Sequence, residues 1–184
     1  ASSAMVGSLV KYFIILDEWI VGAISFCAAA YKLGPRDKHI GWSSTVRQAY
    51  LPRMVDNNRF LILPCVKIKN LASAILAESV RRLKIDWPDK YGVHPVLIET
   101  YVDTSRFTGV CYRAANWVYL GQTQGYSRSA GGFTYHGNKK AIYIHIIDKR
   151  FKKEFKPGTV RLNNAIKELE KMINGIPQWY PSLT

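Results

Sequence analysis

One strongly amphipathic helix stands between two apolar segments, and this arrangement constrains the fold more than any other feature of the sequence. Apolar residues recur at helical spacing over Asn70–Lys84, which begins at a favourable N-cap residue. The flanking segments Arg59–Ile68 and Pro95–Val102 have the composition of buried strands. A strand, a crossover helix and a second strand predict a parallel pair. Because Pro64 cannot donate to a strand ladder, it marks an edge or bulge where the first strand splays away. The sequence therefore predicts a cleft beside Pro64, with the helix N-terminus pointing into it.

The rest of the chain predicts further strands and helices around this unit. We expect a hairpin of Val10–Leu16 with Ile20–Tyr31, a chain break at Gly34–Asp37, a short helix Ser43–Tyr50 capped by Ser43 or Ser44, a turn at Asp56–Asn58, a loop at Asp86–Gly92, a helix Thr104–Asn116, strands Trp117–Leu120 and Lys140–Ile147, and a helix Thr159–Asn174. The predicted fold class is α/β, with a mixed central sheet and flanking helices. We expect one domain over residues 1–150, followed by a basic C-terminal helix and extended tail over residues 151–184.

Composition limits where such a chain can work. A chain of 184 residues with 48% hydrophobic residues fits one globular domain. No apolar run reaches the roughly 18 residues that a membrane span needs, and no secretory leader is visible, so we expect no membrane partner. Three widely spaced cysteines in apolar surroundings predict reduced, buried thiols and a cytoplasmic protein.

Positive charge is the second strong signal. The chain has 26 Lys and Arg against 13 Asp and Glu, a net charge of +13, and residues 104–147 contain no acidic residue. Cations that face a phosphate backbone release counterions, so this balance favours nucleic acid, most simply DNA, as the partner. The candidate nucleic-acid-binding residues are Arg106, Arg113, Arg128, Lys139, Lys140, Lys149, Arg150, Lys152 and Lys153. Trp117, Tyr119 and Tyr126 interleave with them as stacking surfaces. The alternative is a charge that serves solubility and contact with an acidic protein.

The sequence gives little support for metal chemistry. The four histidines lack the spacing of metal ligands and have no neighbouring cysteine pair, so we expect no metal site. Glu99 and Asp103 lie on one face of a predicted strand and leave open a two-metal nuclease site. Asp103 could equally cap the helix that follows it.

The run Lys67-Ile-Lys-Asn-Leu-Ala72 resembles the pyrophosphate loop of the GCN5-related N-acetyltransferases, whose pattern is Gln/Arg-x-x-Gly-x-Gly/Ala before this helix. Asn70 departs from it at the first glycine position. The resemblance implies acetyl-CoA as a cofactor, bound through Lys67, Lys69, Asn70, Leu71 and Ala72. It also implies Tyr112 as the catalytic acid, with Glu99 or Glu18 as the base. The alternative is that Tyr112 packs in the core and hydrogen-bonds a strand, while Glu99 pairs with Arg113.

A longer resemblance rests on short runs in a fixed order. They are Lys32-Leu-Gly-Pro-Arg-Asp37, Ile40-Gly-Trp42, Asn57-Asn-Arg-Phe-Leu-Ile-Leu-Pro64, Asn70-Leu-Ala-Ser73, Pro95–Asp103, Tyr112-Arg-Ala-Ala-Asn-Trp117 and Leu120-Gly-Gln-Thr-Gln-Gly125. Over about residues 6–150 the chain resembles the domain of unknown function found in the Druantia anti-phage protein DruA and in transposase-associated proteins. Such relatives usually carry more chain before the position of Val6, so we expect the first elements of an acetyltransferase-like fold to be missing here.

These observations predict a DNA-associated module of a mobile element or anti-phage defence system, with other defence-system or transposase proteins as further partners. They leave two alternatives open. One is an acyl-CoA-dependent N-acetyltransferase, and the other is a non-catalytic protein-interaction scaffold.

Overall fold

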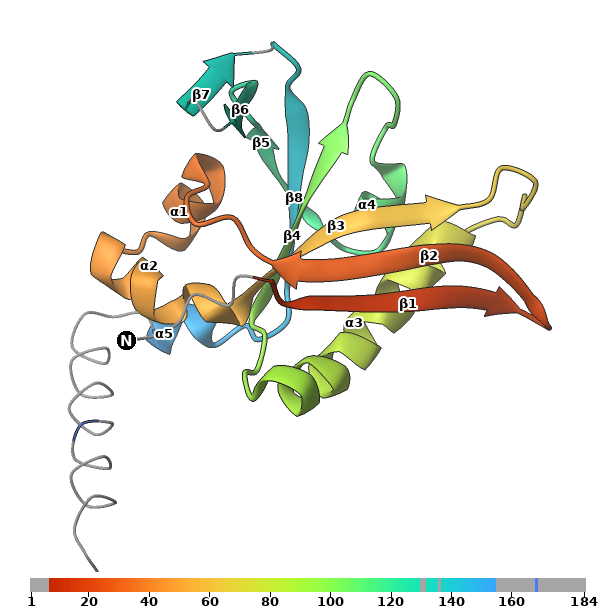
Figure 1. The fold of residues 1–184 in the computed structure, drawn as a ribbon, viewed down its shortest axis with the longest axis horizontal. Helices are drawn as coiled ribbons and strands as arrows, with labels where there is room; N and C mark the ends of the chain where they lie inside the picture. Colours follow the sequence, from red (N-terminus) through yellow and green to blue (C-terminus); the bar gives the residue numbers. More distant parts are fainter. Residues whose placement is uncertain (1–6, 130–131, 136, 155–167, 169–184) are drawn as a thin grey trace, which may run out of the picture.

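A six-stranded mixed sheet with helices on both faces forms the centre of the computed structural model, which describes residues 7–129, 132–135, 137–154 and 168 (Figure 1). The strand order is β1-β2-β3-β4-β8-β5, and β6 and β7 form a separate hairpin. The elements are β1 (Leu9–Leu16), β2 (Trp19–Ala28), α1 (Gly34–Ile40), α2 (Ser44–Tyr50), a 3-10 turn η1 (Leu51–Arg53), β3 (Met54–Ile62), α3 (Leu71–Tyr91), β4 (Leu97–Asp103), α4 (Val110–Ala114), β5 (Val118–Gln122), β6 (Tyr126–Ser129), β7 (Gly132–Tyr135), β8 (Lys140–Ile146) and α5 (Phe151–Glu154). The predicted mixed α/β class is confirmed.

The parallel pair is confirmed, and it diverges as predicted. β3 and β4 are joined through α3 and pair in parallel only over Met54–Asp56 with Leu97–Glu99. Beyond this vertex β3 continues beside β2, whereas β4 continues beside β8 (Figure 1). The splay begins at an irregularity in the β2–β3 register rather than at Pro64, which follows the end of β3. An extra residue on one strand bends that strand away from its neighbour. We call the space between the diverging strands the β3–β4 wedge.

Alternating residues of the central strands enter two hydrophobic clusters on opposite faces. Val55 and Ile98 pack with α3, whose buried residues include Leu76, Leu83 and Trp87. Their neighbours Met54 and Leu97 pack on the other face with residues of α1, α2 and α5. Because strand side chains alternate between faces, each helix layer covers its own face of the sheet.

Four local predictions are wrong. Gly34–Asp37 begins α1 instead of breaking the chain, because proline is compatible with the first turn of a helix. α3 runs through the expected loop at residues 86–92 and ends at Gly92 (φ 67°), because Trp87 is fully buried by continuing the helix. The expected helix over Thr104–Asn116 shrinks to α4 after Gly109 (φ 69°). Residues 56–58 lie within β3 instead of forming a turn.

The remaining sequence predictions have mixed outcomes. Ser43 caps α2 by accepting a hydrogen bond from the Val46 amide, as predicted. Cys27 and Cys111 are half-buried and free, but Cys65 is exposed, so the prediction of three buried thiols is wrong. The predicted helix Thr159–Asn174 lies outside the described residues, apart from residue 168, and the division at residue 150 stays a prediction. No helix among the described residues is long and apolar enough to cross a membrane.

Candidate functional site at the β3–β4 wedge

Hydrogen bonds between side chains close the wedge at its vertex. The Tyr112 hydroxyl donates to Oδ1 of buried Asn57 at 2.9 Å, and the Thr100 hydroxyl donates to the Asn57 carbonyl, also at 2.9 Å. The Tyr112 ring stacks on Tyr143 at 5.7 Å and meets Trp117 edge-on at 5.1 Å. Burial raises the pKa of Tyr112 to about 12. Tyr112 is therefore a protonated core residue whose hydroxyl bridges α4 and β3.

Glu99 lies on the opposite face of the sheet, fully buried. Its oxygens accept hydrogen bonds from Arg36 at 2.8 Å, from the Tyr101 hydroxyl at 3.0 Å and from the Ala30 amide at 3.1 Å. Burial raises the pKa of Glu99, while the Arg36 guanidinium acts to lower it. The expected pairing of Glu99 with Arg113 is wrong. The structure thus separates Tyr112 and Glu99, the two candidate catalytic residues, by the thickness of the sheet.

Arg113 is exposed and lies on the α4 side of the sheet. It donates to the Tyr143 hydroxyl at 3.3 Å and to the Thr108 carbonyl at 3.4 Å. Because the side chain is exposed, the guanidinium also faces solvent, where an anionic ligand could reach it.

Asp56 is a titratable residue that the sequence analysis assigned to a turn. It stands opposite Glu99 in the parallel register, and its Oδ2 lies 3.9 Å from the Cys27 sulfur. Its Oδ1 is buried and has no hydrogen-bond partner among the described residues. Burial, and then the charge of Glu99, raise the pKa of Asp56 to about 8. Asp56 follows the apolar pair Met54–Val55 but is followed by Asn57, Asn58 and Arg59, so no sequence pattern distinguishes this buried aspartate from a turn residue.

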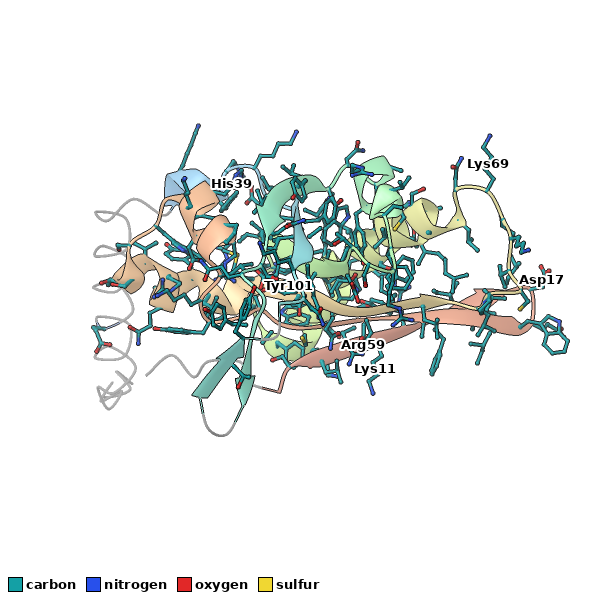
Figure 2. All side chains as sticks on the ribbon, turned by 90° about the horizontal axis from the view of Figure 1, so that it is seen from above. Lys11, Asp17, His39, Arg59, Lys69 and Tyr101 are labelled. Carbon is teal, nitrogen blue, oxygen red and sulfur yellow. The ribbon has the colours of Figure 1, made fainter. Side chains whose placement is uncertain are left out.

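The loop between β3 and α3 carries the candidate cofactor-binding residues. Asn70 adopts a left-handed conformation (φ 61°, ψ 4°), which is the conformation that a glycine would supply at this position. Asn70 thus adopts a backbone conformation that a glycine would also allow. Lys67 and Lys69 are exposed, and Figure 2 shows Lys69 pointing away from the sheet, at the end of the molecule that carries the Asp17 turn.

The start of α3 suits an anionic group. The first hydrogen bond of α3 runs from the Ala74 amide to the Asn70 carbonyl at 3.0 Å. The amides of Ala72 and Ser73 therefore lie before the first bond of the helix. The Leu71 amide reaches the Ile68 carbonyl at 3.3 Å. A 21-residue helix presents its positive dipole end here, next to two lysines. The start of α3 therefore offers a positive dipole end and two exposed lysines to an anionic group.

The candidate nucleic-acid-binding residues divide between the two ends of β8. Lys139 and Lys140 lie at its start, where Lys140 stands opposite Asp103, and Arg106 follows in the turn after β4. Lys149, Arg150 and Lys153 lie beyond the other end, where Arg150 pairs with Asp148 at 3.3 Å. A seven-residue strand spans roughly 20 Å. The predicted single surface over residues 127–153 is thus two separate groups. The side chains of Arg128 and Lys152 lie outside the described part of the structure.

Among the described residues, no group of His, Cys, Asp and Glu is arranged to hold a metal ion. Glu99 and Asp103, the pair considered for a two-metal site, differ sharply in surroundings. Glu99 is buried against Arg36, whereas Asp103 accepts hydrogen bonds from the Ser105 amide and hydroxyl. These Ser105 bonds hold the pKa of Asp103 below its usual value.

Taken with the crossover helix, the diverging parallel pair defines a mixed α/β protein. The chain belongs to the family of the Druantia protein DruA, which matches residues 1–165. Membership in this family points to anti-phage defence.

Comparison with solved structures found acetyltransferases. The aminoglycoside acetyltransferase AAC(6')-Ib in complex with coenzyme A and kanamycin is 14% identical, with a TM-score of 0.49, over 76% of this chain and 67% of that one. A protein assigned to the GNAT acetyltransferase family from Desulfovibrio desulfuricans is 15% identical, with a TM-score of 0.48, over 76% of this chain and 69% of that one. A search of the curated proteins found no match.

Proposed function

We propose that the protein is a nucleic-acid-binding module of an anti-phage defence system, and that DNA binds at the start of β8. The observation that carries this proposal is the group of exposed cations Arg106, Lys139 and Lys140, which outnumber the one carboxylate described beside them, Asp103. Each lysine or arginine that meets a phosphate releases condensed counterions, which drives binding at low salt. The net charge of +13 adds a long-range attraction for a polyanion.

Neighbouring side chains support this choice of surface. Arg106 lies 5.4 Å from the centre of the Phe107 ring, and Phe107 and Tyr119 are both at least half exposed. Exposed aromatic rings beside cations suit unstacked bases and the phosphates that join them. Other defence-system or transposase proteins remain further candidate partners.

A charge-neutralisation experiment tests this surface. The double substitution Lys139→Gln with Lys140→Gln should flatten the plot of log affinity for DNA against log salt by about 1.5, since each phosphate contact contributes about 0.7–0.9 to the slope. The matched control is Lys149→Gln with Lys153→Gln, which removes the same charge at the other end of β8. We expect the control to leave the slope nearly unchanged. Equal slopes for both double variants, or no change in either, would contradict binding at the start of β8.

A second candidate function, acyl-CoA-dependent N-acetyl transfer, is favoured by the left-handed Asn70. In this function the amides at the start of α3 hold the pyrophosphate, and Lys67 and Lys69 neutralise its charge. Acetyl-CoA, when bound, supplies the acetyl group. The Tyr112 hydroxyl keeps the proton that a departing thiolate needs, although its hydrogen bond to Asn57 must first break.

Calorimetric titration with acetyl-CoA separates the candidates. Ala72→Leu should abolish acetyl-CoA binding and leave DNA affinity intact, because the larger side chain crowds the half-buried start of α3. Ala77→Leu, at an exposed position of the same helix, is the matched control. A protein-interaction scaffold would show neither acetyl-CoA heat nor salt-dependent DNA binding.

A further inference from the structure

A cleft of about 790 Å³ lies on the Glu99 face of the sheet, between the first turn of α1 and the strand β5 with its exit to β6. Its polar and aromatic lining comes from Lys32, Tyr101, Gln122, Thr123, Gln124 and Tyr126. Figure 2 shows Tyr101 at the root of the β6–β7 hairpin. The volume is within the range of pockets that hold small organic groups, about 300–1,000 Å³.

Buried hydrogen bonds hold two walls of this cleft together. The Tyr101 hydroxyl donates to Glu99, and Glu99 in turn accepts from Arg36, a fully buried residue of α1. Arg36 also donates to the Ala30 carbonyl at 2.8 Å. These hydrogen bonds join β4 to α1 and hold the Tyr101 side chain in place, so this wall of the cleft is formed before any ligand binds. Because Arg36 pairs with both Glu99 and Asp37, and Arg47 also pairs with Asp37, the charges on this wall balance.

The lining matches the chemistry of a nucleobase. Tyr101 and Tyr126 contribute aromatic rings, of which Tyr126 is 55% exposed and has the Tyr135 ring centre 5.1 Å away. Gln122 and Gln124 are exposed and carry amides that can both donate and accept. Among the residues that the structure describes, Lys32 is the one charged side chain that lines the cleft. Such a lining suits an uncharged, planar group with donor and acceptor edges better than a phosphate, which would need several cations.

The cleft adjoins the proposed phosphate-binding cations. Thr123 and Lys140 exchange two hydrogen bonds, from the Thr123 amide to the Lys140 carbonyl and from the Lys140 amide to the Thr123 hydroxyl, both at 2.9 Å. A lining residue of the cleft is thus bound directly to a cation of the proposed DNA surface. The backbone of Lys140 therefore lies directly beside the lining of the cleft.

We propose that this cleft accommodates one unstacked base of a single strand whose backbone passes over Lys139 and Lys140. The proposal rests on the proposed nucleic-acid-binding function and makes it more specific. It makes the protein a reader of single-stranded or locally opened nucleic acid, because a base within a duplex is not free to enter.

Binding of single-stranded oligonucleotides tests the proposal. Tyr126→Ala should lower the affinity for a single-stranded oligonucleotide about tenfold and leave the salt slope unchanged, since stacking on an aromatic side chain contributes about 1–3 kcal/mol. Tyr31→Ala is the matched control, because Tyr31 is 59% exposed, close to the 55% of Tyr126, and does not line the cleft. We expect no change in the control and no change in duplex affinity for either variant.

A second readout uses the oligonucleotide instead of the protein. A series with one abasic position moved along the strand should show one position at which removal of the base costs the wild-type protein about tenfold. The Tyr126→Ala variant should be insensitive to that position. Salt-dependent binding without any base-sensitive position, or equal loss in Tyr31→Ala and Tyr126→Ala, would overturn the base site while leaving the proposed function in place. Absence of all nucleic-acid binding would overturn both.

Discussion

Replacement of Arg36 by methionine tests the buried ion pair that joins α1 to β4. Arg36 and Glu99 have fully buried side chains and meet at 2.8 Å. Arg36→Met keeps most of the side-chain volume but leaves Glu99, among the described residues, with only the Tyr101 hydroxyl and the Ala30 amide as donors. It also removes the Arg36 partner of Asp37, which keeps Arg47. Loss of one partner of a buried pair costs about 3–5 kcal/mol, because the other charge stays buried without compensation. We expect the free energy of unfolding to fall by an amount in this range.

Two comparisons isolate the charge effect. The pair of Arg81 with Glu78 has side chains that are 73% and 56% exposed, so Arg81→Met should cost at most about 1 kcal/mol. The double substitution Arg36→Met with Glu99→Gln removes both charges and should recover part of the stability lost in the single variant.

The loss of unfolding free energy in Arg36→Met should also depend on pH. Without the guanidinium, burial keeps the pKa of Glu99 above its unfolded value of about 4.3. The folded variant then holds a proton that the unfolded chain releases, so its stability falls as pH rises above that value. Urea denaturation followed by circular dichroism at pH 5 and pH 8 measures this. A deficit below about 1 kcal/mol at both pH values would refute the reasoning.

Three further predictions concern the vertex of the wedge and the loop before α3. The pKa of Asp56 is raised to about 8, so the folded state binds a proton that the unfolded chain loses near pH 4, and stability should fall as pH rises from 4 to 8. Asp56→Asn should remove most of this dependence in urea denaturation, and an unchanged pH profile would contradict it. Tyr112→Phe should lower the free energy of unfolding by about 1–2 kcal/mol by leaving Asn57 Oδ1 without its donor, and a neutral effect in thermal denaturation would argue against that bond. Asn70→Gly should be nearly neutral whereas Asn70→Val should cost about 1–2 kcal/mol, because only the second strains the left-handed backbone; equal stability would contradict this.

The parts of the fold that local pattern determines could be predicted from the sequence. The β1–β2 hairpin, the helix beginning at Asn70 and the parallel pair follow from apolar periodicity and turn residues, and these are confirmed. The prediction of a chain break at Gly34–Asp37 was wrong because glycine and proline are common in loops but also occur at the start of helices. The position of the splay depends on one extra residue in the β2–β3 register, which no periodicity encodes.

The site was less predictable because its contacts join distant residues. Glu99 pairs with Arg36, 63 positions away, and no spacing rule connects them. Asn57, Thr100 and Tyr112 meet only after β3, β4 and α4 are assembled. The sequence suggested Glu99 and Tyr112 as a catalytic pair but could not show that the sheet separates them.

Titration of the protein with labelled DNA at several salt concentrations tests the central claim most directly. We predict micromolar or tighter binding at low salt, with log affinity falling linearly as log salt rises and single strands bound at least as tightly as duplexes. Undetectable binding at low salt, or an affinity independent of salt, would contradict a nucleic-acid-binding function for this protein.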